Sequence, residues 1–184
     1  MSRFSRIVPD GENRERVFCL DCGHVFYENP KIVVGAVVVH GERILLCRRA
    51  IEPRRGFWTL PAGYLELDET PAEGAAREVL EEAGAIIAID GILAVYSISR
   101  IGQVQIIYRA RFAEPSNPAI AVGAESLEVG LFAIGDIPWD DIAFPTVHWA
   151  IDAYRRVGDG VLLAPDTNPQ HDPRGQALPP GMKP

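Results

Sequence analysis

Residues 63–85 read GYLELDETPAEGAAREVLEEAGA, and this stretch decides the fold of the chain. It contains seven acidic residues and one arginine, a charge of −6, whereas the 184 residues of the whole chain sum to −7. The remainder of the protein is therefore close to neutral. Because crowded carboxylates repel one another, the segment needs a compensating charge, and a divalent cation is the obvious candidate.

The middle of this segment predicts a helix over residues 70–83. Thr70 is the N-cap candidate, Pro71 suits the first helical position, and Glu73 completes a capping box with Thr70. Gly84 fits the helix stop. The apolar residues recur at spacings of three and four, so they share one face: Ala75, Ala76, Val79, Leu80 and Ala83.

Strand patterns surround this helix. β-branched and apolar runs at 32–39 and 43–47 predict a hairpin, because a turn-forming segment containing Gly41 separates them. Further short or long strands are expected at 57–60, 86–98, 104–113 and 127–134, and a last helix at 144–157. Strands mixed with two helices indicate the α+β class, arranged as an α/β/α sandwich.

The two ends of the chain look different from this central part. Residues 1–30 are polar and irregular, and 10 of the 27 residues from Gly158 onward are Gly or Pro, which predicts a mobile tail over 158–184. The organisation we expect is a short N-terminal segment over 1–30, one globular domain over 31–157 and the tail over 158–184.

Composition excludes several classes of protein. Apolar residues make up 47% and charged residues 23%, as in soluble globular proteins. The longest apolar run has eight residues, which is too short for a membrane span, and the N-terminal residues lack the apolar core of a signal peptide. A pI of 5.1 argues against nucleic-acid binding. Three cysteines are too few for a disulfide framework, so we expect a cytoplasmic protein.

The acidic residues of the predicted helix form a candidate metal site. Glu78, Glu81 and Glu82 share one edge of the helix, and Arg77 lies one turn before Glu81 and within reach of Glu69. Carboxylate oxygens at this density suit Mg²⁺ or Mn²⁺. The alternative is a solvated acidic face without a ligand.

The spacing of these residues resembles the Nudix box at every fixed position. The matching residues are Gly63, Glu69, Arg77, Glu78, Glu81, Glu82 and Gly84. The resemblance implies a Nudix fold, with a mixed sheet and helices on both faces. It also implies a metal site made by Glu78, Glu81, Glu82 and the carbonyl of Ala62, and a structural ion pair between Glu69 and Arg77.

Members of that family cleave a nucleoside diphosphate linked to another group, by attack of water at phosphorus. The general base differs among them. Some use a glutamate of the box, here Glu81 or Glu82, and others a glutamate from a later loop. In this chain the loop candidates are Glu125 first and Glu128 second; the alternative is that both are solvated residues before a strand.

Several residues outside the box are candidates for binding the substrate. Arginines can hold a diphosphate by paired hydrogen bonds, and aromatic rings can stack on a base. The candidates are Arg48, Arg49, Arg54, Arg55, Trp58 and Tyr64, with Tyr96 and Phe132 as further aromatic residues. The alternatives are a solvated basic loop for the arginines and a core position for Trp58.

The resemblance extends over residues 17–157, to a Nudix subgroup with an N-terminal zinc ribbon that includes ADP-ribose and FAD pyrophosphatases. Such ribbons carry two Cys-x-x-Cys pairs, whereas here only Cys19 and Cys22 form one, and residues 3–6 contain no cysteine. Zinc needs four ligands, and His24 would supply a third at most. The two interpretations are bound Zn²⁺ and a degenerate ribbon with two free thiols. Cys47 reads as a core residue.

The resemblance therefore implies a Mg²⁺-dependent hydrolase that releases AMP and a phosphorylated product from ADP-ribose or FAD. The downstream signature of NADH-type enzymes is absent, and Ser99-Arg100-Ile101 stands where many ADP-ribose enzymes carry a proline. NADH or another dinucleotide remains an alternative substrate, and a non-catalytic nucleotide sensor is the alternative function. Members of the subgroup are commonly homodimers, which we expect here too.

Overall fold

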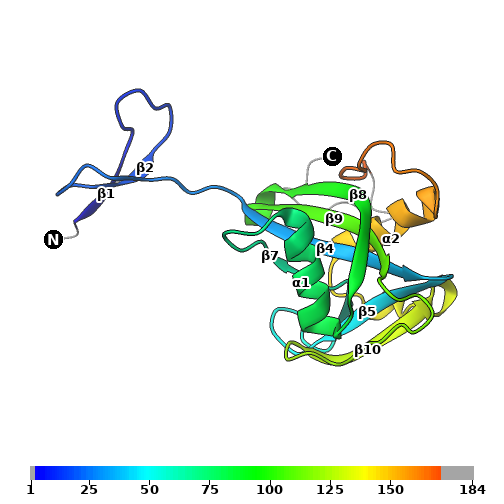
Figure 1. The fold of residues 1–184 in the computed structure, drawn as a ribbon. Coiled ribbons are helices and arrows are strands. Elements are labelled where there is room, and N and C mark those ends of the chain that lie inside the picture. Colours follow the sequence, from blue (N-terminus) through cyan, green and yellow to red (C-terminus); the bar gives the residue numbers. More distant parts are fainter. Residues whose placement is uncertain (1–2, 171–184) are drawn as a thin grey trace. The chain divides into compact units, whose positions relative to one another are not determined.

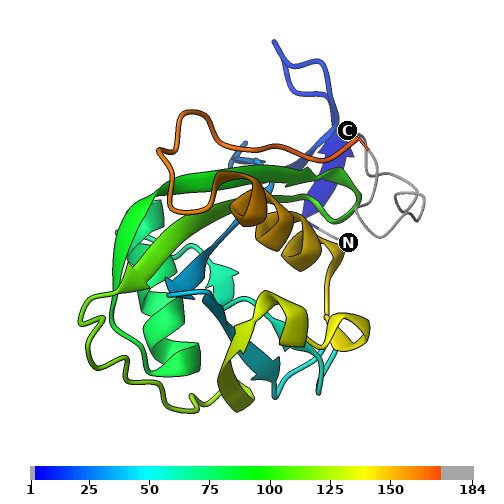
Figure 2. The same cartoon turned by 90° about the vertical axis from the view of Figure 1, so that its right-hand side faces the viewer.

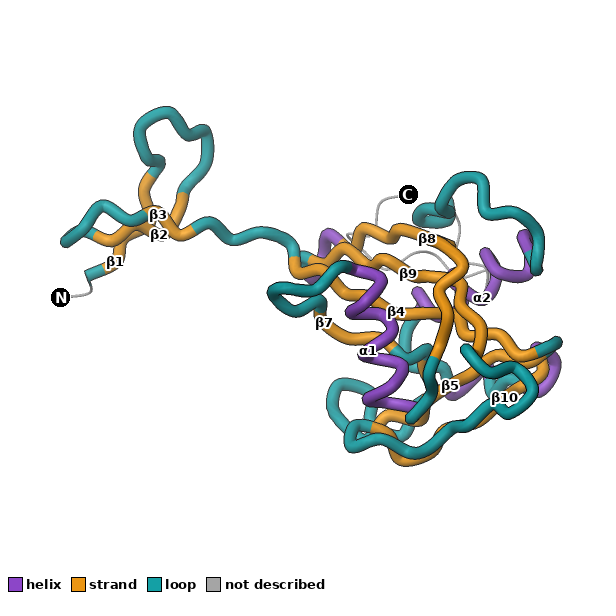
Figure 3. The backbone as a smooth tube through the Cα atoms, in the orientation of Figure 1, coloured by secondary structure: helices purple, strands orange, loops and turns teal. Residues whose placement is uncertain are grey.

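The computed structural model describes residues 3–170. The chain divides into two compact units, and the boundary along the sequence lies between Pro30 and Lys31. The first unit is a three-stranded antiparallel sheet of β1 (Phe4–Ile7), β2 (Arg16–Cys19) and β3 (Val25–Phe26), in the order β1-β2-β3 (Figure 3). The expectation of an irregular segment over 1–30 was therefore wrong. These strands are only two to four residues long, too short to show a clear alternation in the sequence.

The second unit is a seven-stranded mixed sheet. Its strands are β4 (Lys31–His40), β5 (Arg43–Arg49), β6 (Trp58–Thr59), β7 (Ala62–Tyr64), β8 (Ile87–Ile98), β9 (Gln103–Phe112) and β10 (Ser126–Ala133). The main order is β10-β5-β4-β9-β8, with β6 paired to β5 and β7 to β4. Only the central pair β4–β9 is parallel; the other pairs are antiparallel. The predicted hairpin between β4 and β5 is confirmed, because Val39 pairs with Ile44.

Two helices cover opposite faces of this sheet, as Figures 1 and 2 show: α1 (Pro71–Ala83) and α2 (Pro145–Val157). The α/β/α sandwich is therefore confirmed. Short 3-10 helices lie at Ser99–Ile101, Ile134–Asp136 and Trp139–Asp141. None of the helices in residues 3–170 is long and apolar enough to cross a membrane.

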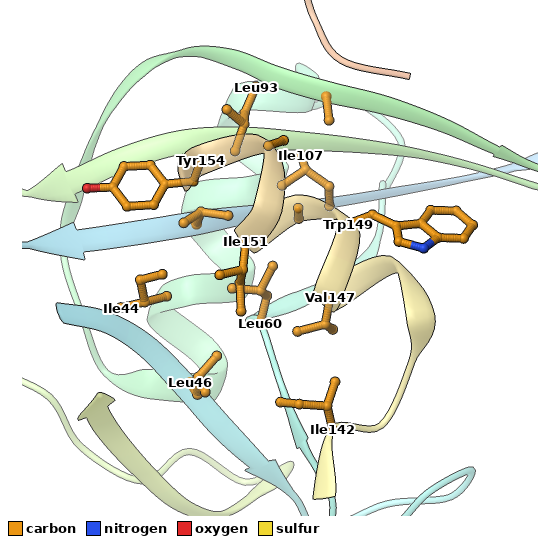
Figure 4. Close-up of a cluster of buried hydrophobic side chains, with 14 of the residues drawn as sticks. Ile44, Leu46, Leu60, Leu93, Ile107, Ile142, Val147, Trp149, Ile151 and Tyr154 are labelled. Carbon is orange, nitrogen blue, oxygen red and sulfur yellow. The ribbon is translucent and has the colours of Figure 1, made fainter. Parts of the chain in front are cut away.

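Each face of the sheet has its own hydrophobic core, which explains why β4 is apolar at nearly every position. Val34, Ala36 and Val38 pack with α1, whereas Val37 and Val39 pack on the α2 side. Burial on both faces is expected for a central strand with a parallel neighbour. The α2 core is drawn in Figure 4, where Ile44 and Leu46 of β5 lie near side chains of α2, among them Val147, Ile151 and Tyr154.

Helix α1 starts and ends where the sequence predicted. The side chain of Thr70 accepts a hydrogen bond from the Glu73 amide, and the Glu73 carboxylate accepts one from the Thr70 amide at 2.8 Å. Gly84 ends the helix with φ 60°, a left-handed conformation that glycine adopts without strain. Both ends of the helix are therefore fixed by the caps that the sequence predicted.

The chain after α2 is anchored on β8 as far as it is described. The backbone of Asp166 accepts from the Val95 amide and donates to the Leu93 carbonyl, and the Asn168 side chain bonds both backbone groups of Ser97. Figure 2 shows this segment running along β8. The predicted tail over 158–184 is thus hydrogen-bonded to β8 at Asp166 and Asn168, and its residues 171–184 lie outside the described part.

Two aromatic residues of the α2 core, Tyr96 and Trp149, have polar atoms without a hydrogen-bond partner among the described residues. Tyr96 is fully buried, and its hydroxyl finds no hydrogen-bond partner among the described residues. Tyr96→Phe should raise the free energy of unfolding by about 1 kcal/mol, because it removes an unsatisfied buried group and keeps the ring. Tyr96→Ala should lower it by roughly 3–5 kcal/mol by leaving a cavity. Urea unfolding measures both, and a destabilised Tyr96→Phe protein would contradict this account of the core.

Candidate active site

Arg77 is the centre of the acidic segment. Its Nε and Nη2 atoms donate to the two carboxylate oxygens of Glu69 at 3.0 and 2.8 Å, the ion pair that the box predicted. Nη1 reaches Glu78 at 2.7 Å and Glu81 at 2.9 Å, and Nη2 also donates to the Tyr64 carbonyl at 3.0 Å. The hydrogen bonds from Arg77, followed by one from the Glu66 amide, lower the pKa of Glu69 to about 2.

Glu82 and Glu78 lie against the turn that precedes the helix. Glu82 is 6% exposed, and one of its oxygens accepts from the Ala62 amide at 3.1 Å. Burial raises the pKa of Glu82 to about 7, and burial also raises the pKa of Glu78. A Cβ atom on Gly63 would lie 2.4 Å from the Glu78 carboxylate, so a side chain at this position would displace that carboxylate.

The loop before β10 brings a fourth carboxylate to this place. The amides of Ala121 and Gly123 donate to the last carbonyls of α1, those of Ala83 and Glu82, at 2.7 and 3.2 Å. The Glu125 carbonyl accepts from the Ala50 amide at 2.8 Å, which fixes the end of the loop. Burial is the main cause of the raised pKa of Glu78 and Glu82, and the charge of Glu125, which lines the same cleft, adds to it.

These groups line a cleft of about 870 Å³ on the second unit. Glu78, Glu81, Glu82 and Glu125 line it together with Ala62, and Arg49 adds a positive charge close enough to Glu82 to oppose the rise in its pKa. Glu128 lies elsewhere, because its carboxylate pairs with Arg48 at 3.5 Å and neither residue lines the cleft.

The donor set of the cleft fits a divalent metal ion. Six carboxylates and three arginines line the cleft, so negative charge is in excess, and the carboxylates are hard oxygen donors. Among residues 3–170, no three acidic, His or Cys side chains already stand in metal-binding geometry. Instead, Arg77 bonds Glu78 and Glu81, and the Ala62 amide bonds Glu82. The chemistry fits, and the side chains would need to change partners.

The structure separates the candidate substrate residues into two groups. Arg49 and Tyr64 line the cleft. The Nε atom of Arg49 donates to the Pro53 carbonyl at 2.9 Å, and its guanidinium lies 5.3 Å from the centre of the Phe144 ring. These bonds hold Arg49 beside the acidic cluster and leave part of its guanidinium to face a ligand.

The other candidates lie outside the cleft. The guanidinium of Arg54 lies over the Phe57 ring, and Arg55 is exposed on the same loop. Trp58 is 8% exposed and packs edge-on against Phe132, so it belongs to the core. Tyr96 is likewise buried. The cleft instead contains residues that the motif did not point to: Arg100, Gln103, Gln105, Phe144 and Thr146. For the two glutamines, polar residues alternating along an apolar strand were the available signal.

The two cysteines of the first unit lie in one tight turn. The Gly23 amide donates to the Cys19 carbonyl, and backbone hydrogen bonds from Cys22 and Asp21 lower the pKa of Cys19. In the described residues no disulfide involves them, and the His24 ring packs against Phe26 with the ring centres 4.6 Å apart. The described part of the unit thus offers two thiols, whereas zinc takes four ligands. Cys47 is buried in the α1 core, and burial raises the pKa of its thiol.

Comparison with known proteins agrees with this geometry. A family model described as "NUDIX domain" matches residues 29–157, and a zinc-ribbon model described as "Nudix N-terminal" matches residues 2–28. The chain belongs to the Nudix family. A Nudix hydrolase from Nitrosomonas europaea of known crystal structure is 40% identical, with a TM-score of 0.82 over 90% of this chain and 93% of that one.

Curated Nudix relatives match over shorter stretches. A "MutT-like protein" of Streptomyces ambofaciens is 41% identical over 97 residues, 53% of this chain and 59% of the relative. An "ADP-ribose pyrophosphatase" of Methanocaldococcus jannaschii is 37% identical over 71 residues, 39% of this chain and 42% of the relative. The chain therefore spans less than two thirds of either relative. An ADP-ribose pyrophosphatase from Streptococcus suis is 18% identical with a TM-score of 0.63 and shows a common fold.

The raised pKa of Glu82 predicts a pH-dependent stability in the metal-free protein. The folded state holds the Glu82 proton up to about pH 7, whereas the unfolded chain releases it near 4.5. Stability should therefore fall as the pH rises from about 4.5 to 7, by up to roughly 3 kcal/mol from this group. Glu82→Gln should lack that fall, and Glu42→Gln, on an exposed turn, should keep it. The measurement is the free energy of unfolding in EDTA across this pH range. If it changes with pH in the same way for wild type and Glu82→Gln, the raised pKa of Glu82 is contradicted.

Proposed function

We propose that this Nudix protein hydrolyses the diphosphate of a nucleoside diphosphate derivative with Mg²⁺ or Mn²⁺, releasing AMP and a phosphorylated product, with ADP-ribose or FAD as substrate. The observation that carries the proposal is the gathering of four carboxylates and Arg49 in one cleft. The name of the Methanocaldococcus jannaschii relative supports ADP-ribose. The size of the cleft, about 870 Å³, is sufficient for a dinucleotide-like molecule.

In this proposal Glu78, Glu81, Glu82 and the Ala62 carbonyl hold the metal ion. When bound, such an ion neutralises phosphate oxygens and lowers the pKa of a coordinated water. Arg49 binds oxygens of the diphosphate, because its guanidinium is a positive charge beside the acidic cluster. Glu125 takes the proton of the water whose oxygen attacks one phosphorus, and the bond from that phosphorus to the bridging oxygen breaks, so that the bridging oxygen leaves with the phosphate of the second product.

Product identification tests the reaction. The full chain with Mg²⁺ should release AMP plus ribose 5-phosphate from ADP-ribose, or AMP plus FMN from FAD, and NADH and diadenosine polyphosphates complete the panel. Glu82→Gln should lower kcat by about 100-fold or more, and Glu42→Gln should not change it. If wild type releases no AMP from any of these compounds, it is not the proposed hydrolase; tight binding without turnover would then favour a nucleotide sensor.

The positions of Glu125 and Glu128 make a second prediction. Glu125→Gln should lower kcat by about 10²- to 10⁴-fold and remove the acidic limb of the pH–rate profile, as expected for loss of a general base. Glu128→Gln is the matched control, because Glu128 lies three residues away and pairs with Arg48 outside the cleft. Equal effects of the two changes on kcat would refute Glu125 as the base.

A further inference from the structure

One end of the cleft is built from neighbouring strands whose side chains stand in register. Val33 of β4 pairs with Tyr64 of β7 on one side and with Gln105 of β9 on the other. Residues paired in this way point to the same face of a sheet. All three line the cleft, and Gln103, two residues before Gln105, lines it as well.

The polar atoms of this end form a relay of hydrogen bonds. Gln103 donates from Nε2 to the Tyr64 hydroxyl at 3.3 Å, and Gln105 donates from Nε2 to Oε1 of Gln103 at 3.3 Å. The Lys31 ammonium lies 5.2 Å from the centre of the Tyr64 ring and helps to hold it. Within residues 3–170, the Oε1 atom of Gln105 has no hydrogen-bond partner, and a second N–H of the same amide also remains.

The cleft lining around these amides is mainly apolar, with Arg100 as its charged side chain. Val33, Ile98, Ile101 and Ile107 line the same part of the cleft. Apolar walls with an amide edge suit a flat heterocycle that carries hydrogen-bonding groups on its rim. A ribose or a phosphate would instead require several hydroxyl or charged partners.

We propose that this end of the cleft binds the nucleobase of the substrate and that Gln105 selects adenine. The inference rests on the proposed function, in which the substrate is a nucleotide. Adenine presents an amino donor beside a ring-nitrogen acceptor, and a glutamine amide pairs with both. Hypoxanthine and guanine present a carbonyl oxygen in place of the amino group, which would face the acceptor oxygen of Gln105.

Tyr64 is a positioning residue for this selection. In the structure the Tyr64 hydroxyl accepts from Gln103 and the Oε1 atom of Gln103 accepts from Gln105, an arrangement that leaves the acceptor oxygen of Gln105 available to a ligand. A reversed relay would present two N–H donors and would favour the carbonyl of hypoxanthine. Removing the hydroxyl frees Gln103 to turn, so base selection should weaken even though Gln105 is still present.

The test compares binding of AMP and IMP to the full chain by isothermal titration calorimetry at fixed Mg²⁺. Wild type should prefer AMP by about 10- to 100-fold, the range for one amide–adenine pair. Gln105→Met should bring the ratio of the two dissociation constants close to one by weakening AMP. Tyr64→Phe should lower the ratio to a smaller extent. Gln170→Met, an exposed glutamine outside the cleft, is the matched control.

Two results would overturn the inference: a wild-type preference within twofold, or a Gln105→Met protein that keeps the wild-type ratio. If Gln105→Met fails to fold in a thermal unfolding experiment, Gln105→Asn replaces it, because the shorter amide withdraws from the ligand. AMP release measured on the same samples separates the two proposals. A preference for AMP without turnover refutes the proposed hydrolase and supports the base site. Turnover without a preference for AMP supports the hydrolase and refutes the base site.

Discussion

The guanidinium of Arg77 is the interaction on which the site depends. It joins Glu69 in the loop, the Tyr64 carbonyl on β7, and Glu78 and Glu81 on α1. Three carboxylates so close together would repel one another without a shared cation. The hydrogen bonds to Glu69, more than those to the other two, raise the pKa of Arg77 above its usual value, so it remains charged at any ordinary pH. Loop, strand and helix are thereby held in one arrangement.

The same network holds the carboxylates of the candidate metal site close together without a metal, although not yet in metal-binding geometry. Arg77 bonds both oxygens of Glu69 but shares a single nitrogen between Glu78 and Glu81. A cation entering the cleft competes with that one nitrogen, and the bidentate pair with Glu69 is left in place. Glu82 differs, because burial holds its pKa near 7 and entry of a cation would displace its proton at neutral pH. In the proposed metal site, the structural and ligand-binding roles would thus be divided among neighbouring glutamates.

Features set by neighbouring residues could be predicted from the sequence, and features set by distant pairing could not. The capping box of Thr70 and Glu73 and the hairpin at Gly41 have local causes. The fixed spacing of the Nudix-box residues was sufficient to locate the acidic helix. The four arginines between residues 48 and 55 show the limit. Consecutive strand residues face opposite sides, so the register of β5 turns Arg49 to the cleft and leaves Arg48 beside Glu128 of β10. That register depends on strands far along the chain, as does the anchoring of Asp166 on β8.

Glu125 shows how a residue forty positions from the box becomes part of the site. The last carbonyls of any helix lack partners within the helix, and they need donors from elsewhere when the helix end is covered. Here the loop amides of Ala121 and Gly123 supply them. The approach is so close that a Cβ atom on Gly123 would lie 1.7 Å from the Glu81 carbonyl oxygen. The loop that satisfies the end of α1 therefore also delivers the Glu125 carboxylate to Glu78 and Glu82, and any side chain at position 123 would separate them.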